Sequence, residues 1–499
     1  MSTQWITRFP LEILFLTIGA INDRNDLLSF ALTCRFIYQL IIPDKLKHFR
    51  ISSLIKNFDL WNHLLQNLHL CRGSHEFELT DGARIPHARQ RSRIHNDPKY
   101  MTIVSNSLPQ IIRNMVNLSR VKFSWRNTDF EIFRNLLDAL GDSSCKLEEF
   151  DLFLDIPRPS RNSTLMTEVM KLENLQIWTK LDRTALQKIS IRVGTSWSRT
   201  SVSLHQANWV GDMLSDTPKL THLSLTIQHT KLSVNILDYT WPNLENFVIN
   251  NHSIFPTPVG VVDVQPPSKF IDFFKRHPKL TTLSLPWFVY PRSLFPYITV
   301  ECLPNLESFA YDGEPRSPLS KVLSPASARR LRHLTIRDNA LGCSNNLEIY
   351  KELTSLQTFS FTLNPLATNH SNTTLNPILE VLAMHATDLQ KIHLPTFGVL
   401  SEISYAALSF LQRFPKLTYL SGIWAYDIND HDLLLQALYQ CRQLEYAIYL
   451  GNDNTCRVFR LIREFEQEDK DERISVEVVS GKNLDFDMRT WGNFYNKVL

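Results

Sequence analysis

Short apolar triplets recur along most of the chain, each with the spacing L-x-x-[LIVF]-x-[LIVFY]. The first copies begin at Leu118 and Leu147, and weaker copies at the end begin at Leu417 and Leu444. Between them the pattern starts again at Leu186, Leu220, Leu244, Leu280, Leu306, Leu331, Leu356 and Leu389. Intervals of roughly 24 to 39 residues are typical of a repeat protein that grows by adding units.

Each triplet predicts one short strand, because alternate side chains of a strand point to opposite faces. The segments between triplets predict helices, and prolines such as Pro218, Pro278 and Pro415 stop them before the next strand. The expected helices are residues 130–140, 207–214, 270–275, 377–385, 405–414 and 433–441. Residues 76–79 are expected to form the first strand, and residues 474–479 a strand that caps the last repeat. One parallel strand and one helix per repeat predict an α/β solenoid, an irregular horseshoe with strands inside and helices outside. A β-propeller is disfavoured, because its units have four strands and no helices.

The first fifty residues follow a different pattern of three apolar runs separated by polar breaks. Pro10 and Glu12 suit a first helical turn. The following run contains Leu11, Ile13, Leu14, Leu16, Ile18 and Ile21, and the next two runs cover residues 27–34 and 36–42. Three helices in about 40 residues bury their own apolar faces poorly. We therefore expect an exposed apolar surface that suits a partner.

An N-terminal signal peptide is the other interpretation of this stretch, since Arg8 precedes the apolar residues 13–21. Glu12 interrupts its leading edge, no small-residue cleavage site follows, and the apolar pattern resumes at Leu27. No other segment approaches the length of a membrane span. The sequence therefore predicts a protein of the cytoplasm, the nucleus or both, with no membrane partner.

The order of residues at the N-terminus resembles the F-box motif. Phe9-Pro10-x-Glu12-Ile13-Leu14 is similar to its Leu-Pro-x-Glu-Ile opening, and Asp26-Leu27-Leu28 leads to Cys34-Arg35, a Val-Cys-Arg-like element. The resemblance covers residues 8–48, with Phe9 in place of the leading Leu and small residues at Gly19-Ala20. The triplets behind it resemble leucine-rich repeats. An F-box joined to leucine-rich repeats is similar to the substrate receptors of SCF-type cullin–RING ubiquitin ligases.

This resemblance implies that the N-terminal helices dock on the ligase adaptor and, through it, on the cullin and RING subunits. The repeats would then bind an unknown protein substrate. The candidates for the adaptor surface or its support are Phe9, Pro10, Ile13, Leu14, Leu27, Leu28, Leu32 and Cys34. The alternative is that these residues are only the core of a helical cap on the solenoid. The chain would then be a non-degradative scaffold or an enzyme-inhibitor-like repeat protein.

Composition and motifs favour a binding protein over an enzyme. The apolar fraction is 43%, and 53 basic against 50 acidic residues give a formal charge of +3. This balance does not indicate nucleic acid as the main partner. The seven cysteines are scattered, so neither a disulfide framework nor a zinc site is expected. No phosphate-binding loop, nucleophile elbow or metalloprotease motif occurs, and we expect no catalytic residues, metal or cofactor.

The expected substrate surface is the strand face opposite the helices. Its predicted residues begin with charged pairs, such as Arg120 and Lys122, Glu149 and Asp151, and Lys188 and Arg192, and continue with small hydroxyl side chains. Aromatic side chains are enriched in binding hot spots. The substrate candidates are therefore Tyr419, Trp424, Tyr426 and Tyr446, with Trp287 and Tyr290 as a second group. Burial of these aromatic rings under neighbouring loops is the competing interpretation.

The resemblance thus implies an F-box at residues 5–48, a connecting helix and basic loop at 49–100, a leucine-rich-repeat solenoid at 101–480 and a tail at 481–499.

Overall fold

The computed structural model separates into two units. The first unit comprises residues 1–236 and 253–256, and the second comprises residues 237–252 and 257–499. The structure describes residues 10–21, 24–41, 49–80, 103–125, 130–156, 181–195, 205–206, 208–227, 230–231, 236–249, 267–285, 298–313, 319–338, 347–363, 372–393, 413–424, 443–450, 456–465 and 472–479. Each unit is described by itself.

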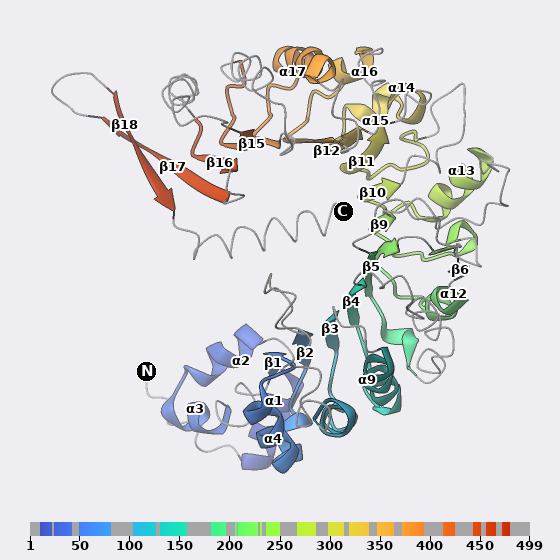
Figure 1. Ribbon diagram of the computed structural model, residues 1–499, viewed down its shortest axis with the longest axis vertical. Coiled ribbons are helices and arrows are strands. Elements are labelled where there is room, and N and C mark those ends of the chain that lie inside the picture. The colour runs from blue at the N-terminus through green and yellow to red at the C-terminus, as the bar shows by residue number, and fades with distance from the viewer. Residues whose placement is uncertain are drawn as a thin grey trace, which may run out of the picture. The chain divides into compact units, whose positions relative to one another are not determined.

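The first unit starts with three short helices, after which strands and helices alternate (Figure 1). The three helices are α1 (Leu11–Ala20), α2 (Arg24–Ala31) and α3 (Arg35–Ile41). The later helical elements are α4 (Phe58–Gln66), α5 (Leu68–Cys71), η3 (Ile103–Ser107), α8 (Leu108–Arg113), α9 (Phe130–Asp142), η5 (Arg183–Ala185) and α12 (Asn208–Leu214). The strands are β1 (Arg50–Leu54), β2 (Glu76–Thr80), β3 (Arg120–Trp125), β4 (Glu149–Ile156), β5 (Lys188–Thr195), β6 (His205–Gln206), β7 (His222–Ile227) and β8 (Thr230–Lys231).

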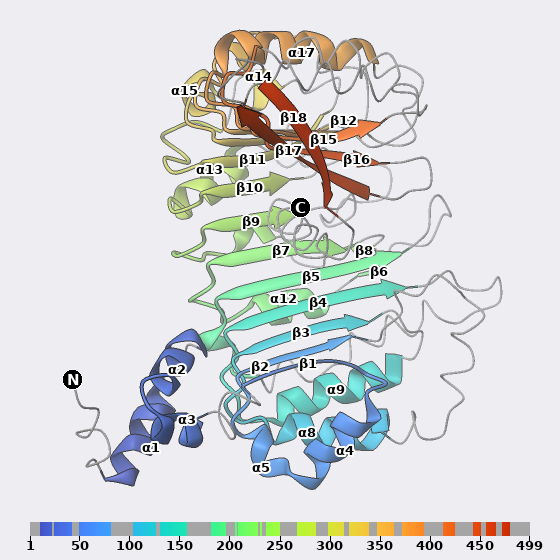
Figure 2. The same ribbon diagram turned by 90° about the vertical axis from the view of Figure 1, so that its left-hand side faces the viewer.

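The main sheet of this unit is parallel and follows the chain in the order β1-β2-β3-β4-β5-β7 (Figure 2). One face of the sheet packs against the helices through aromatic side chains. The Phe77 ring lies 6.3 Å from Trp61 of α4 and 6.1 Å from Phe123, whose ring lies 5.9 Å from Phe133 of α9. These rings are fully buried, so the core runs continuously from strand to strand.

The second unit repeats the same scheme. Its helical elements are η6 (Ile236–Asp238), which starts one residue before the unit, α13 (Pro267–Arg276), α14 (Leu319–Val322), α15 (Pro325–Ala328), α16 (Glu348–Lys351) and α17 (Asn372–His385). Its parallel strands are β9 (Asn246–Ile249), β10 (Thr282–Leu285), β11 (Ser308–Gly313), β12 (His333–Asp338), β13 (Thr358–Leu363), β14 (Lys391–His393), β15 (Tyr419–Trp424) and β16 (Tyr446–Leu450). Two antiparallel strands follow, β17 (Cys456–Phe465) and β18 (Glu472–Val479).

A repeated hydrogen-bond pattern joins neighbouring strands in both units. The residue before a strand offers its carbonyl oxygen to two successive N–H groups at the start of the next strand. In the first unit Ser119 accepts from Glu148 and Glu149, and in the second Glu307 accepts from Arg332 and His333, over N···O distances of 2.7–3.0 Å. The repeat leucine just before each of these strands is buried, from Leu118 to Leu444. Each unit is therefore an α/β solenoid-like stack with one parallel strand per repeat.

The predicted parallel strands are confirmed at every triplet from residue 118 to residue 444. Helices were predicted correctly at α9, α12 and α13, whereas α17 starts at Asn372, five residues earlier than expected. Residues 405–412 and 433–441, two further expected helices, lie outside the described residues. The connecting basic loop at residues 82–99 and the tail at 481–499 lie outside them as well.

Four strands were missed, namely β1, β17 and the short pair β6 and β8. The sheet begins at β1, so the prediction that residues 76–79 form its first strand was wrong. The strand β1, Arg-Ile-Ser-Ser-Leu, lacks the leucine triplet from which the other strands were predicted. In the second unit β18 was predicted, but β17, its antiparallel partner, was not.

Phe49 connects the three N-terminal helices to the sheet. Its side chain is 3% exposed and belongs to the same apolar cluster as Leu14, Ile18 and Leu27. Its ring also stacks on His75, 4.6 Å between centroids, and its carbonyl accepts hydrogen bonds from the N–H groups of His75 and Glu76. The helices are thus tied to the start of β2 by one buried aromatic residue.

Candidate functional site

The three N-terminal helices expose an unusual amount of apolar surface. Ten large hydrophobic side chains are exposed among the described residues, and seven of them lie on α1–α3 or in the turn between α2 and α3. These seven are Leu11, Ile13, Phe15, Leu16, Leu28, Leu32 and Tyr38. A large exposed apolar patch on a protein surface commonly marks a site where a partner binds.

The buried part of the helices forms a small core of its own. A narrow stripe of α1, Leu14 and Ile18, packs with Leu27 and Ala31 of α2 and with α3. Four other apolar side chains of α1 face outward, namely Leu11, Ile13, Phe15 and Leu16, and Leu16 is 71% exposed. Since the core needs only one stripe of each helix, the other apolar side chains remain for a partner.

The structure divides the predicted adaptor residues into two groups. Leu14 and Leu27 are buried in the core and Cys34 packs half-buried against it, so these residues support the surface. Pro10, Ile13, Leu28 and Leu32 are exposed. Phe9 lies outside the described residues.

Sequence reasoning missed part of this surface. Leu11 and Leu16 were counted in the apolar run of the first helix but not among the adaptor candidates, and Phe15 and Tyr38 were not selected. Helical spacing offers no signal here, because Leu11, Leu14, Phe15 and Ile18 have the i, i+3, i+4 and i+7 spacing of a single helix face. In a helix that is apolar almost throughout, periodicity does not separate the buried side chains from the exposed ones.

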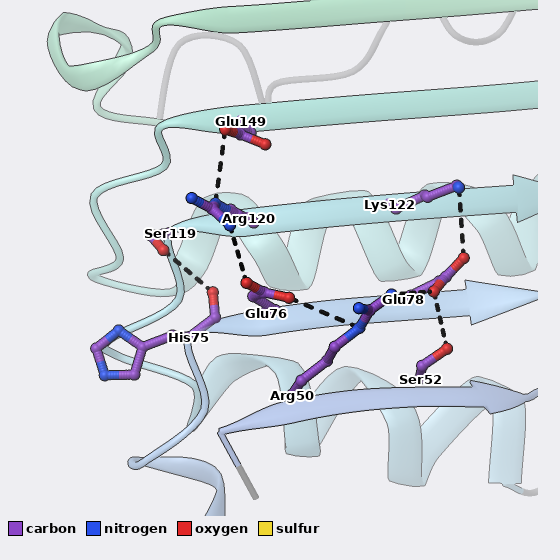
Figure 3. A network of polar contacts seen from close by, with 9 residues as sticks. All are labelled: Arg50, Ser52, His75, Glu76, Glu78, Ser119, Arg120, Lys122 and Glu149. Atoms are coloured by element: carbon purple, nitrogen blue, oxygen red, sulfur yellow. Dashed lines mark hydrogen bonds and ion pairs between the residues drawn. The ribbon is translucent and has the colours of Figure 1, made fainter. Parts of the chain in front are cut away.

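A second surface lies on the face of the first unit's sheet opposite the helices. Figure 3 shows the side chains standing on this face of β1–β4, with helices running behind the strands. The strand register aligns them in rows across the sheet. The first row reads Arg50, Glu76, Arg120, Glu149, Lys188 and His222, and the second reads Ser52, Glu78, Lys122, Asp151, Ser190 and Ser224. Charges therefore alternate from strand to strand.

Ion pairs connect the first row. Glu76 reaches Arg50 at 3.6 Å through one oxygen and Arg120 at 2.9 Å through the other. Glu149 Oε1 lies 3.5 Å from Arg120 Nε and 2.7 Å from Lys188 Nζ. Opposite charges directly across strands stabilise a sheet by roughly 0.2–1 kcal/mol per pair. The row thus contributes modestly to the stability of the sheet.

The second row contains the more perturbed acids. Burial opposes the ionisation of Glu78, but the hydrogen bond from Ser52, 2.8 Å, and the charge of Lys122 outweigh it and lower the pKa of Glu78. Asp151 shows the opposite balance, since burial raises its pKa despite the nearby charges of Lys122 and Arg192. Burial also lowers the pKa of Arg192, whose guanidinium lies 5.8 Å from the Phe153 ring centre.

One row on the corresponding face of the second unit consists mainly of small, polar and buried side chains. Ser284, Thr335, Ser360 and Ser421 each have less than a tenth of their surface exposed. His393 stands in the same row, with Nδ1 2.9 Å from Ser421 Oγ. A histidine beside a serine can act as a general base, but burial lowers the pKa of His393 to about 3. Such a weak base is a poor proton acceptor near neutral pH.

The aromatic substrate candidates are only partly placed by the structure. Tyr419 and Tyr446 are register partners on β15 and β16, and both side chains are half-buried. The Tyr419 ring lies 5.3 Å from that of His393, and its hydroxyl is buried. Trp424 ends β15, while Trp287, Tyr290 and Tyr426 lie outside the described residues. The Tyr419 hydroxyl therefore faces the protein, as the burial interpretation expects.

Another buried histidine, His277, has a purely structural environment. Its Nε2 accepts a hydrogen bond from the Trp241 N–H at 2.9 Å, so its proton resides on Nδ1, which donates to the Phe273 carbonyl. Burial lowers the pKa of His277 to about 4. The neutral ring fastens the end of α13 to Trp241.

In the described residues no group of three or more His, Cys, Asp or Glu side chains is arranged to hold a metal ion. Within the same residues no helix has the length and apolarity that crossing a membrane requires. Comparison with known proteins finds no family model and no curated protein that matches this chain.

Proposed function

We propose that the chain is the substrate-binding subunit of an SCF-type cullin–RING ubiquitin ligase. In this proposal α1–α3 form an F-box that docks on the adaptor, and the strand face of a leucine-rich-repeat solenoid holds a protein substrate. The observation that carries it is the concentration of exposed large apolar side chains on α1–α3. Together with the F-box-like order of residues from Pro10 to Arg35, this observation supports the proposal.

The exposed residues favour docking over a simple cap. A helical cap gains stability by burying its apolar side chains against the first repeat. Phe49 does make such a contact and favours the capping alternative to that extent. However, Leu16 and Leu32 are 71% and 68% exposed, which costs solubility unless a partner covers them.

The repeat architecture supports the other half of the proposal. One buried leucine precedes each parallel strand of the two main stacks from β3 to β16, which is the arrangement that leucine-rich repeats use. The opposite strand face presents polar and charged side chains in regular rows. A receptor of this kind needs no catalytic group, because it raises the effective concentration of a bound protein near the ubiquitin-charged enzyme.

The test uses the full chain and the purified adaptor of an SCF-type ligase. We expect a stable complex by size-exclusion chromatography. Ile13→Asp with Leu28→Asp should abolish it, because two charges would be buried without partners at the interface. Both side chains are more than 40% exposed, so the variant should remain folded.

Met384→Asp is the matched control, since Met384 is an exposed apolar residue of α17 in the second unit. This variant should bind the adaptor like the wild-type chain. The ligase proposal is wrong if wild-type chain and adaptor elute separately at concentrations of tens of micromolar. The repeat scaffold whose helices only cap the solenoid then becomes the better interpretation.

A further inference from the structure

The charge rows of the first unit are unevenly exposed. The side chains of Arg50, Arg120, Lys122 and Lys188 are 47–52% exposed. Those of Glu76, Glu78 and Glu149 are only 23–29% exposed. The carboxylates therefore lie lower on the sheet, and the cationic groups form its outer layer.

The ion pairs leave the cationic groups able to bind more. The guanidinium of Arg120 has five N–H donors, and its ion pairs to Glu76 and Glu149 engage only Nη1 and Nε. Arg50 likewise uses Nε and Nη2 for Glu76 and Glu78. The acids, by contrast, are already engaged by two bases each. A ligand approaching this face therefore meets donors, although the row as a whole is nearly neutral.

The register gives these donors a defined spacing. In the first row the bases occupy every second strand, with Arg50 on β1, Arg120 on β3 and Lys188 on β5. Neighbouring strands are about 4.8 Å apart, so alternate strands are about 9.6 Å apart. An extended polyproline II chain has three residues per turn and rises about 3.1 Å per residue. Its every third side chain therefore recurs on one side about every 9.3 Å.

We propose that this sheet face binds an acidic peptide segment with carboxylates at every third position. The segment runs across the strands in a polyproline II-like conformation, and its carboxylates meet Arg50, Arg120 and Lys188. The proposal rests on the proposed function only in assigning the segment to the ligase substrate. A nucleic acid fits less well, because carboxylates separate the bases and would oppose a continuous phosphate backbone.

The first experiment compares the binding of three peptides to the full chain by fluorescence anisotropy. One peptide repeats Glu-Pro-Ser four times, a second contains the same residues with all Glu contiguous, and a third has Gln in place of Glu. We expect the periodic peptide to bind at least fivefold more tightly than the contiguous one, and the Gln peptide not to bind. Equal affinity of the two acidic peptides, or no binding of either, would overturn the proposal.

A second experiment tests the residues. Arg120→Gln with Lys188→Gln should weaken binding of the periodic peptide about fourfold to 25-fold, since exposed charge contacts contribute about two- to fivefold each. Arg329→Gln with Lys416→Gln is the matched control, because both residues are exposed bases in ion pairs, with Glu352 and Asp388. Similar losses in the two double variants would overturn the proposal.

Two further measurements distinguish a loss of binding contacts from misfolding, and a failure of the peptide proposal from a failure of the ligase proposal. The charge-preserving variant Arg120→Lys with Lys188→Arg should keep at least half of the binding affinity, and its loss of binding with an unchanged melting temperature would contradict the spacing argument. Adaptor binding is titrated on the same preparations. Peptide binding without adaptor binding would refute only the proposed function, whereas adaptor binding without peptide binding would refute only the peptide proposal.

Discussion

Leu32 and Leu14 should respond in opposite ways to truncation. Both were predicted from the sequence to serve the adaptor surface, but Leu32 is 68% exposed and Leu14 is 5% exposed. Leu32→Ala should therefore weaken adaptor binding and leave the fold intact. Leu14→Ala should destabilise the three-helix core and affect binding only through unfolding.

The expected magnitudes follow from these exposures. Fully burying a leucine side chain contributes about 1.5–3 kcal/mol. Docking can remove at most the exposed two-thirds of Leu32 from water, which corresponds to about 1–2 kcal/mol, or about five- to 30-fold in affinity. For Leu14, truncation in a packed core costs about 2–5 kcal/mol of folding free energy. The two variants thus separate interface from core.

The assay pairs isothermal titration of adaptor into the full chain with urea denaturation of each variant. Met384→Ala again serves as the control, since it removes an exposed apolar side chain from α17. The assignment fails if Leu32→Ala binds as tightly as the wild-type chain. It also fails if Leu14→Ala lowers affinity at unchanged stability, because Leu14 would then lie in the interface itself.

Three further outcomes are expected. Burial depresses the pKa of His277 to about 4, so its contribution to stability is complete above pH 6.5 and is lost as the pH falls toward 4, by about 3 kcal/mol. Urea titrations from pH 7.5 to 4 should show this loss of unfolding free energy, and His277→Gln should make the unfolding free energy depend less on pH. Phe49→Ala should destabilise the first unit by about 3–5 kcal/mol in calorimetry, and Phe49→Leu by clearly less. Cys71, buried and with a pKa raised to about 11, should resist iodoacetamide in the folded chain and react in urea, and labelling without urea would contradict this.

The parallel strands were predictable because each contains its own local signal. The leucine before a strand and the two apolar residues within the strand are all buried. Their regular spacing is therefore visible in the sequence. The strand β1 lacks the first leucine, and Ile51 is its one fully inward side chain. It joins the sheet through pairing with β2, a tertiary contact that periodicity does not encode.

The split between core and surface in α1 was not predictable for a different reason. A hydrophobic stripe identifies the buried face only when the other faces are polar. In α1, Leu11, Phe15 and Leu16 are as apolar as Leu14 and Ile18, so periodicity cannot select among them. The structure makes the choice through α2 and α3, whose buried side chains share one apolar cluster with Leu14 and Ile18.

The charged face was predictable in part. Alternation along β3, β4 and β5 identifies Arg120, Glu149 and Lys188 as outward-facing residues. The alternation of positive and negative charges across the sheet depends on the register between strands that lie about 30 or 40 residues apart in sequence. Arg50 and Glu76 extend the row only because β1 and β2 belong to the sheet. The donor spacing on which the peptide proposal depends is therefore a property of the fold.

The two proposed surfaces of the first unit differ in their physical chemistry, and this difference makes the two binding reactions separable. Adaptor docking on α1–α3 depends on apolar burial, which kosmotropic salts such as sulfate strengthen. Peptide binding on the sheet depends on half-exposed charges, which salt screens over a Debye length of about 3 Å at 1 M ionic strength. In sodium sulfate at about 1 M ionic strength, adaptor affinity should be kept or increased while periodic-peptide affinity falls at least tenfold. Parallel loss of both would mean that the helices dock through charge, contrary to their exposed leucines.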